Sequence, residues 1–213
     1  MAKTIDEKLT EGRQYRAVVE VRALDGAEDD SRIVEGYATT FGQPYELWRD
    51  DGYVFLEQVD RHAFDETDLS DVIMQYDHAG RVFARTSNGT LDLDADDHGL
   101  HIRAELGGTE IGRQLYEEIK GGYTDKMSFG FSVAEEAREI IEDHENGITT
   151  VLRTIKRIGK LYDVSAVSLP ANNATEISAR SYCDGVIVEL TEEHRKAEAR
   201  ERQRQRIRIL LEV

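Results

Sequence analysis

Short segments in which apolar and polar residues alternate recur along most of this chain, and few folds are compatible with such a series. A two-residue period is typical of β-strands with one buried face. The segments cover residues 14–24, 32–42, 71–78, 89–106, 126–133, 148–158 and 159–170. Turn residues separate them at short spacing, and helices do not alternate with them as in a parallel α/β fold. The sequence therefore predicts an α+β, β-rich fold, a mainly antiparallel sheet or β-barrel flanked by short helices.

Three segments are predicted to be helical, and a loop is expected around Trp48. The first helix is short and lies near residues 60–68. The second spans 109–122, because Thr109 can cap its start, apolar residues follow at helical spacing, and glycines end it. The third begins at Thr191 and is rich in charge, with apolar side chains only near its end. A solvated helix and a docking element are equally compatible with that composition.

These expectations divide the chain into a flexible N-terminal tail at 1–13, a main domain at 14–185 and a charged C-terminal helix at 186–213. The net charge of −16 is unevenly distributed. Residues 1–190 contain 20 Lys and Arg against 38 Asp and Glu, whereas residues 191–213 contain 7 against 5. An acidic main domain disfavours contact with the phosphate backbone, so we expect no nucleic-acid partner.

Other classes of protein are excluded by what the sequence lacks. Cys183 is the only cysteine, so an intrachain disulfide cannot form, and this fits a reducing compartment. No stretch approaches the roughly 20 apolar residues of a membrane span, and the start has no apolar core of a secretory signal. The acidic repeat at 92–96 lacks the glycine of a calcium loop, and His98 and His101 lack a third zinc ligand. We expect an intracellular protein without membrane contact, metal or organic cofactor.

Three positions in the predicted strands could support chemistry. His78 lies at the end of the predicted strand 71–78, just before Ala79-Gly80, where an imidazole can face a cleft. Ser128 lies on the small-residue face of the strand 126–133, opposite its large apolar side chains. Asp163 lies in an apolar strand, where a carboxylate needs a partner.

Hydrolysis by serine requires these three kinds of side chain. An imidazole takes the hydroxyl proton, a third group holds the imidazole, and backbone amides bind the oxyanion. Ser128, His78 and Asp163 supply one candidate for each side-chain role, and the amides near Phe129 and Gly130 are candidate oxyanion donors. Each residue taken alone is more often structural than catalytic. Because an ordinary imidazole titrates at about pH 6.5, activity of such a site is expected to rise through neutral pH.

Seven motifs resemble, in order and spacing, the prohead proteases of tailed bacteriophages. They are GYATTFG, EQVDRHAF, a strand ending in YDH, GLHIRAEL, a helix ending in IKGG, KMSFGF and LYDVSAVSLPAN, and together they span residues 32–174. Their combination makes the resemblance specific, since no single piece identifies a family. Two positions depart from the family's pattern. Ala79 follows the histidine where the family commonly has an acid, and Asp163 stands where it often has glutamate.

The resemblance implies a fold similar to the herpesvirus assemblins, a β-barrel ringed by helices. It also implies that Ser128 is the nucleophile, His78 the general base and Asp163 the orienting acid. Members of that family cleave scaffold or capsid-protein segments inside the immature shell. We therefore expect a serine endopeptidase with the major capsid protein and scaffold segment as substrates, located in the procapsid within the host cytoplasm. Self-cleavage and self-association are left open, as is docking or removal of the C-terminal helix.

Two alternatives are compatible with the same residues. A catalytically inactive protein could keep the family's shape as a scaffold or capsid-assembly factor, and it would bind capsid protein without cutting it. A small β-rich ligand-binding protein would require the order of the motifs to be coincidental.

Overall fold

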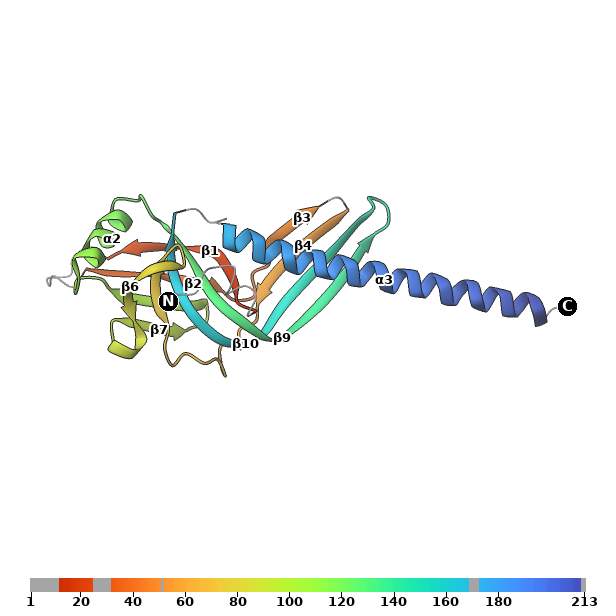
Figure 1. Ribbon diagram of the computed structural model, residues 1–213, viewed down its shortest axis with the longest axis horizontal. Coiled ribbons are helices and arrows are strands. Elements are labelled where there is room, and N and C mark those ends of the chain that lie inside the picture. The colour runs from red at the N-terminus through yellow and green to blue at the C-terminus, as the bar shows by residue number, and fades with distance from the viewer. Residues whose placement is uncertain (1–11, 25–31, 51, 169–172, 212–213) are drawn as a thin grey trace. The chain divides into compact units, whose positions relative to one another are not determined.

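The alternating segments form the strands of one sheet in the computed structural model, which describes residues 12–24, 32–50, 52–168 and 173–211 (Figure 1). The strands are β1 (Gln14–Ala23), β2 (Ile33–Thr40), β3 (Tyr45–Asp50), β4 (Tyr53–Val59), β5 (Ile73–Tyr76), β6 (Ala79–Arg85), β7 (Leu91–Ala95), β8 (Gly99–Glu105), β9 (Lys126–Asp143) and β10 (Ile148–Val167). A 3-10 turn, η1 (Thr86–Asn88), and the helices α2 (Glu110–Lys120) and α3 (Asn173–Leu211) complete the described elements. They belong to two compact units that divide between Ala179 and Arg180.

The order of the strands confirms a β-rich, mainly antiparallel sheet. Neighbours follow the order β3-β4-β10-β9-β1-β2-β8-β7, and β5 pairs with both β10 and β6. Only β4 and β5 run parallel to β10 among the described pairs. The two ends of the order, β3 and β7, do not pair with each other in the part of the chain that the structure describes. The closed barrel that we expect is therefore not confirmed.

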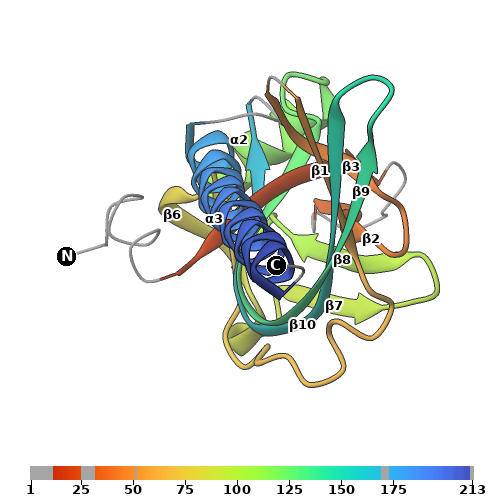
Figure 2. The same cartoon turned by 90° about the vertical axis from the view of Figure 1, so that its right-hand side faces the viewer.

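The longest strands, β9 and β10, form a curved hairpin at the centre of the sheet (Figures 1 and 2). The alternation predicted for the start of β9 is present. Met127, Phe129 and Phe131 are fully buried in the hydrophobic core, and the two phenylalanine rings stack with centroids 4.5 Å apart. Burial of one such side chain contributes about 1.5–3 kcal/mol. The opposite face of β9 carries Ser128 and Gly130 and is free for polar contacts.

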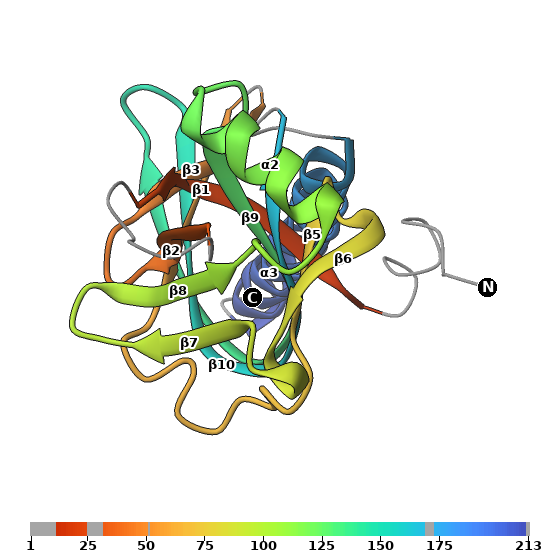
Figure 3. The ribbon, with the colours of Figure 1, turned by 90° about the vertical axis from the view of Figure 1, so that its left-hand side faces the viewer.

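Helix α2 forms where the sequence predicts it. The Thr109 hydroxyl accepts a hydrogen bond of 3.1 Å from the backbone N–H of Gly112, which caps the start of the helix. Leu115, Tyr116 and Ile119 lie at helical spacing and are buried in the core. The helix contacts β1 and β2 (Figure 3).

Several boundaries differ from the sequence-based expectation. Strand β3 lies where we expect a loop, because residues around Trp48 pair with β4. Residues 61–66 form consecutive turns instead of a helix. Strand β10 is continuous where two strands are expected, and β9 extends through the acidic segment to Asp143, so the two share one ladder.

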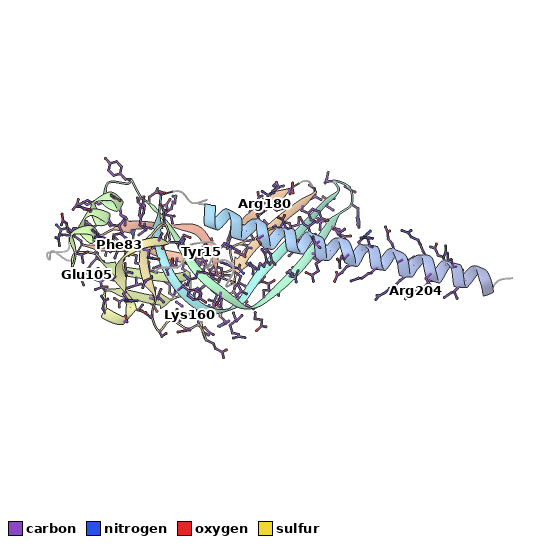
Figure 4. All side chains as sticks on the ribbon, viewed as in Figure 1. Tyr15, Phe83, Glu105, Lys160, Arg180 and Arg204 are labelled. Carbon is purple, nitrogen blue, oxygen red and sulfur yellow. The ribbon has the colours of Figure 1, made fainter. Side chains whose placement is uncertain are left out.

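Helix α3 begins at Asn173, well before Thr191, where a helix is expected. Its C-terminal part, from Arg180 onward, forms the second unit. Residues 191–208 of this part are all exposed and mostly charged (Figure 4). Pairs spaced four residues apart stabilise it, such as Arg202 and Glu198 at 2.8 Å. None of the helices in the described residues has both the length and the apolarity to cross a membrane.

Candidate active site

The sheet brings together the three side chains that the sequence predicts for the site. His78 Nδ1 lies 2.5 Å from Asp163 Oδ1, and His78 Nε2 lies 2.6 Å from Ser128 Oγ. All three residues are fully buried. An ionised carboxylate can only accept hydrogen bonds, so Nδ1 donates to Asp163 and Nε2 accepts from the serine hydroxyl. This is the arrangement in which a serine can lose its proton to an imidazole.

The register of β9 and β10 explains why Ser128 and Asp163 share a face. Ser128 pairs with Ser165, and Gly130 pairs with Asp163. Side chains of paired residues lie on the same face, and those two positions apart return to it. Phe129 and Val164 consequently point to the opposite face, into the core.

His78 lies in a turn, and the expectation that it ends a strand is wrong. Strand β5 stops at Tyr76, β6 starts at Ala79, and the two residues between them have φ angles of +47° for Asp77 and +57° for His78. Positive φ at both central residues matches the right-handed twist of a tight hairpin. Residues other than glycine pay about 1–2 kcal/mol for this conformation. The strained backbone thus belongs to Asp77 and to His78, the residue that carries the imidazole.

Asp77 connects this turn to the end of β10. Its N–H donates to the carbonyl oxygen of Ala166 at 3.0 Å, and its carboxylate accepts from the N–H of Ser168 at 3.1 Å. The Ser168 hydroxyl also donates to Asp77 Oδ2, at 3.1 Å. These contacts hold the histidine's backbone beside the strand that provides Asp163.

Asp163 is ionised in spite of its burial. Burial raises the pKa of this carboxyl most strongly, but His78, the Ser165 hydroxyl and the Arg13 guanidinium together bring the pKa below its ordinary value. The Ser165 hydroxyl donates to Oδ1 at 2.8 Å, and Arg13 Nη1 lies 3.6 Å from Oδ2. Asp163 can therefore accept a hydrogen bond from His78 Nδ1–H and stabilise a charged imidazole.

Gly130 provides the space for this carboxylate. A Cβ atom built on Gly130 would lie 2.5 Å from Asp163 Oδ2 and 2.8 Å from Tyr15 Cε1. Both distances are shorter than any relaxed contact of carbon, so a side chain at this position would displace the acid or the tyrosine.

Two residues at the site are missed by the reasoning from sequence, Arg13 and Tyr15. The Tyr15 ring packs on the His78 ring, with centroids 4.3 Å apart and planes tilted by 55°. Burial and the nearby Asp163 charge raise the pKa of Tyr15 to about 12, so its hydroxyl stays protonated. No local spacing relates these residues to His78, Ser128 or Asp163, because only the pairing of β1 with β9 brings them close.

The segments weighed for metal binding have structural contacts instead. Asp96 Oδ1 accepts from the N–H groups of His98 and Gly99, at 2.7 and 2.9 Å, and so closes the turn between β7 and β8. Among the described residues, no group of three His, Cys, Asp or Glu is placed to hold a metal ion.

Comparisons with known proteins point to one family. The sequence model of the caudovirus prohead serine proteases matches residues 17–185. The prohead protease of Enterobacteria phage HK97 is 28% identical over 155 residues, which cover 72% of this chain and 62% of that protein. The match thus spans less than two thirds of that relative's length. The solved structure of the bacteriophage T4 capsid assembly protease has a TM-score of 0.36 and 14% identity, over 73% of this chain and 99% of that one. A structural likeness of that size does not by itself support a shared fold.

Proposed function

Because this chain belongs to the family of caudovirus prohead serine proteases, we propose that it is a serine endopeptidase of phage procapsid maturation. Its substrates are segments of the scaffold and of the major capsid protein, and it acts inside the immature capsid in the host. The observation that supports the proposal most directly is the pair of hydrogen bonds that link Ser128 through His78 to Asp163.

The reaction follows from the roles of these three side chains. His78 Nε2 takes the proton of Ser128 Oγ while that oxygen attacks the peptide carbonyl carbon. The tetrahedral intermediate collapses when His78 gives the proton to the leaving amine, and an ester with Ser128 remains. A water molecule, deprotonated by His78, then hydrolyses the ester and restores the serine. Asp163 accepts from Nδ1 throughout and stabilises the imidazolium, without itself taking up the proton.

We propose a protease domain at 14–185, and the family match at 17–185 supports these bounds. The charged helix at 186–213 then has a separate role in docking or is removed. The docking role is tested by deleting residues from Thr191 onward, which we expect to reduce packaging into the capsid and to leave peptide cleavage intact.

The test of the function is co-expression of the full chain with the major capsid protein that it accompanies, followed by a denaturing gel. We expect a shortened capsid product with the wild type and only the intact capsid protein with Ser128→Ala. The Ser128→Ala variant removes the nucleophile and should lower activity by about 10⁴-fold or more. Mass spectrometry of the shortened product gives the cleaved bond.

Identical banding for the two proteins, with neither capsid cleavage nor self-cleavage, contradicts the protease proposal and favours an inactive assembly factor. A fluorophosphonate probe provides an independent measurement, because it labels only a serine activated as a nucleophile. We expect labelling of the wild type and none of Ser128→Ala.

A further inference from the structure

The second oxygen of the Asp163 carboxylate and the Tyr15 hydroxyl are the two buried side-chain polar atoms without a hydrogen-bond partner in the part of the chain that the structure describes. Oδ1 is bound by His78 and by the Ser165 hydroxyl. Oδ2 is buried and has no hydrogen-bond partner among the described residues. The negative charge on Oδ2 must therefore be stabilised by an interaction other than a direct hydrogen bond.

The cation that faces this oxygen is Arg13, which directly precedes β1. Its Nη1 atom lies 3.6 Å from Oδ2, within the range of an ion pair. The Arg13 side chain is only 16% exposed and that of Asp163 is 1% exposed, so water screens the attraction weakly. A charge placed there acts on the carboxylate much more strongly than an exposed ion pair would.

A second contact holds Arg13 in position. Its guanidinium carbon lies 3.7 Å above the centroid of the Tyr162 ring, a geometry typical of a cation–π interaction. Tyr162 directly precedes Asp163 in β10. The ring that contacts the Arg13 guanidinium and the carboxylate that faces it therefore belong to neighbouring residues. Two residues after Arg13, Tyr15 packs on His78. The start of β1 thus contacts both the acid and the base.

We propose that Arg13 is a positioning residue for the reaction, and this inference rests on the proposed protease function. Arg13 neutralises Oδ2 and fixes the Asp163 carboxylate, so that Oδ1 is aimed at His78 Nδ1. It also limits how strongly the negative charge of Asp163 retains a proton on His78. It acts through Asp163, without contact to the reacting atoms.

The expected effect of removing Arg13 has a definite sign. His78 faces Asp163 from β10, Ser128 from β9 and Tyr15 from β1, and Asp77 is its neighbour in the turn. Without Arg13, the full charge of Asp163 acts on the imidazole, which then keeps its proton to higher pH. Since only the unprotonated imidazole is a base, the acid side of the pH profile should move to higher pH.

The experiment compares the full-length wild type with Arg13→Met, Arg13→Lys and Arg22→Met. Arg22 is the matched control, because it lies in β1, the strand that Arg13 precedes, and pairs with Glu35 at 2.7 Å, but its side chain is 78% exposed. The rate constant kcat/KM is measured from pH 5.5 to 9 with a quenched fluorescent peptide. The peptide has the sequence around the capsid bond whose cleavage mass spectrometry identifies.

For Arg13→Met we expect the plateau of kcat/KM to fall on the order of tenfold. The acid limb of its pH profile should move to higher pH by about half a unit or more. Arg13→Lys should restore the position of the limb, and Arg22→Met should match the wild type. An unshifted limb in Arg13→Met overturns the proposal, whatever the plateau. So does a shifted limb that lysine does not restore. If circular dichroism shows that Arg13→Met does not fold, Arg13→Gln replaces it under the same criteria.

Failure of this inference is distinguishable from failure of the proposed function. If the wild type neither reacts with the fluorophosphonate probe nor cleaves capsid protein, the function is wrong. If the wild type does both and the profile of Arg13→Met is unchanged, only the role of Arg13 is wrong.

Discussion

Glu57 and Asp163 are both fully buried carboxylates in the same sheet, but their surroundings differ in kind. Glu57, in β4, accepts from Arg16 through both of its oxygens, at 2.5 and 2.9 Å. It also accepts from Arg153 at 2.6 Å and from the Tyr45 hydroxyl at 2.5 Å. Asp163 instead accepts from one imidazole and one hydroxyl, and its second oxygen faces Arg13 without a hydrogen bond.

The partners of the two carboxylates decide whether a proton can be exchanged beside them. Burial raises the pKa of Glu57 most strongly, yet the two arginines outweigh it and bring the pKa to about 2. Every partner of Glu57 keeps its proton at neutral pH, so the cluster cannot exchange one. The main partner of Asp163 is a histidine, which titrates near neutral pH in ordinary surroundings. The same sheet therefore holds one carboxylate whose partners cannot exchange a proton and one whose main partner can, which is what the proposed reaction requires of Asp163.

The largest effect is expected for Asp163→Asn. The neutral amide cannot stabilise a charged imidazole and favours the wrong tautomer of His78, which should lower kcat by about 10³–10⁴-fold. Cleavage of the fluorescent peptide measures the loss, and thermal unfolding checks that the fold is kept. Ser165→Ala, which removes one hydrogen bond to the same oxygen, is the control and should cost far less. Near-wild-type activity of Asp163→Asn would exclude this residue as the orienting acid.

The corresponding substitution at the other buried carboxylate is Glu57→Gln. It removes the carboxylate charge that Arg16 and Arg153 share, although Arg153 keeps its ion pair with Glu136 at 2.5 Å. The free energy of unfolding should therefore fall by about 3–5 kcal/mol. Denaturant unfolding of the full chain measures the change. Glu46→Gln is the matched control, since Glu46 pairs with Arg49 at 2.7 Å but is 48% exposed, and its loss should stay below about 1 kcal/mol. Equal losses in the two variants would mean that burial does not distinguish these pairs.

Gly130→Ala tests how closely Asp163 is held. Its Cβ atom would approach Oδ2 to 2.5 Å, and a shift of the acid by about 1 Å should lower kcat/KM on the order of 100-fold. Gly159→Ala, in β10, is the control because the nearest atom to its Cβ is Ser132 Oγ at 3.3 Å, a contact that a small rotation relieves. A fully active Gly130→Ala variant would show that the carboxylate has more freedom than the structure indicates.

The last comparison concerns how the free energy of unfolding changes as the pH becomes acidic. Because the folded pKa of Glu57 is about 2, below its ordinary value of 4.5, its contribution is present above about pH 4.5 and is lost as the pH falls toward 2. The stability difference between wild type and Glu57→Gln should thus shrink by about 2–3 kcal/mol between pH 5 and pH 2. Denaturant unfolding at each pH measures it. A constant difference over this window would contradict the depressed pKa.

Where local alternation decides the outcome, the sequence predicts the strands and the faces on which Ser128 and Asp163 lie. Ser128 lies opposite Phe129 because a strand alternates, and this needs no knowledge of the neighbours. The position of His78 could not be predicted in the same way. Asp77-His78 lacks the glycine that usually announces a two-residue turn, so the alternation appears to continue through it.

Contacts that depend on the register of distant strands also escape local reasoning. Arg13 and Tyr15 reach the site only because Tyr15 pairs with Gly130 and Gly130 pairs with Asp163. The early start of α3 is hidden for a different reason. Val186, Ile187 and Val188 are β-branched and disfavour a helix locally, yet they lie inside a long one.

The central place of β10 has a consequence for the chain as it is made on the ribosome. This strand pairs with β4, β5 and β9, supplies Asp163, and holds the histidine turn through Ser168. It is also the last strand of the sheet in chain order. A nascent chain therefore lacks part of β10 or the contact from Ser168 to the histidine turn until residue 168 has emerged. Synthesis itself thus delays assembly of the candidate site, since a nascent chain that ends before residue 163 lacks Asp163.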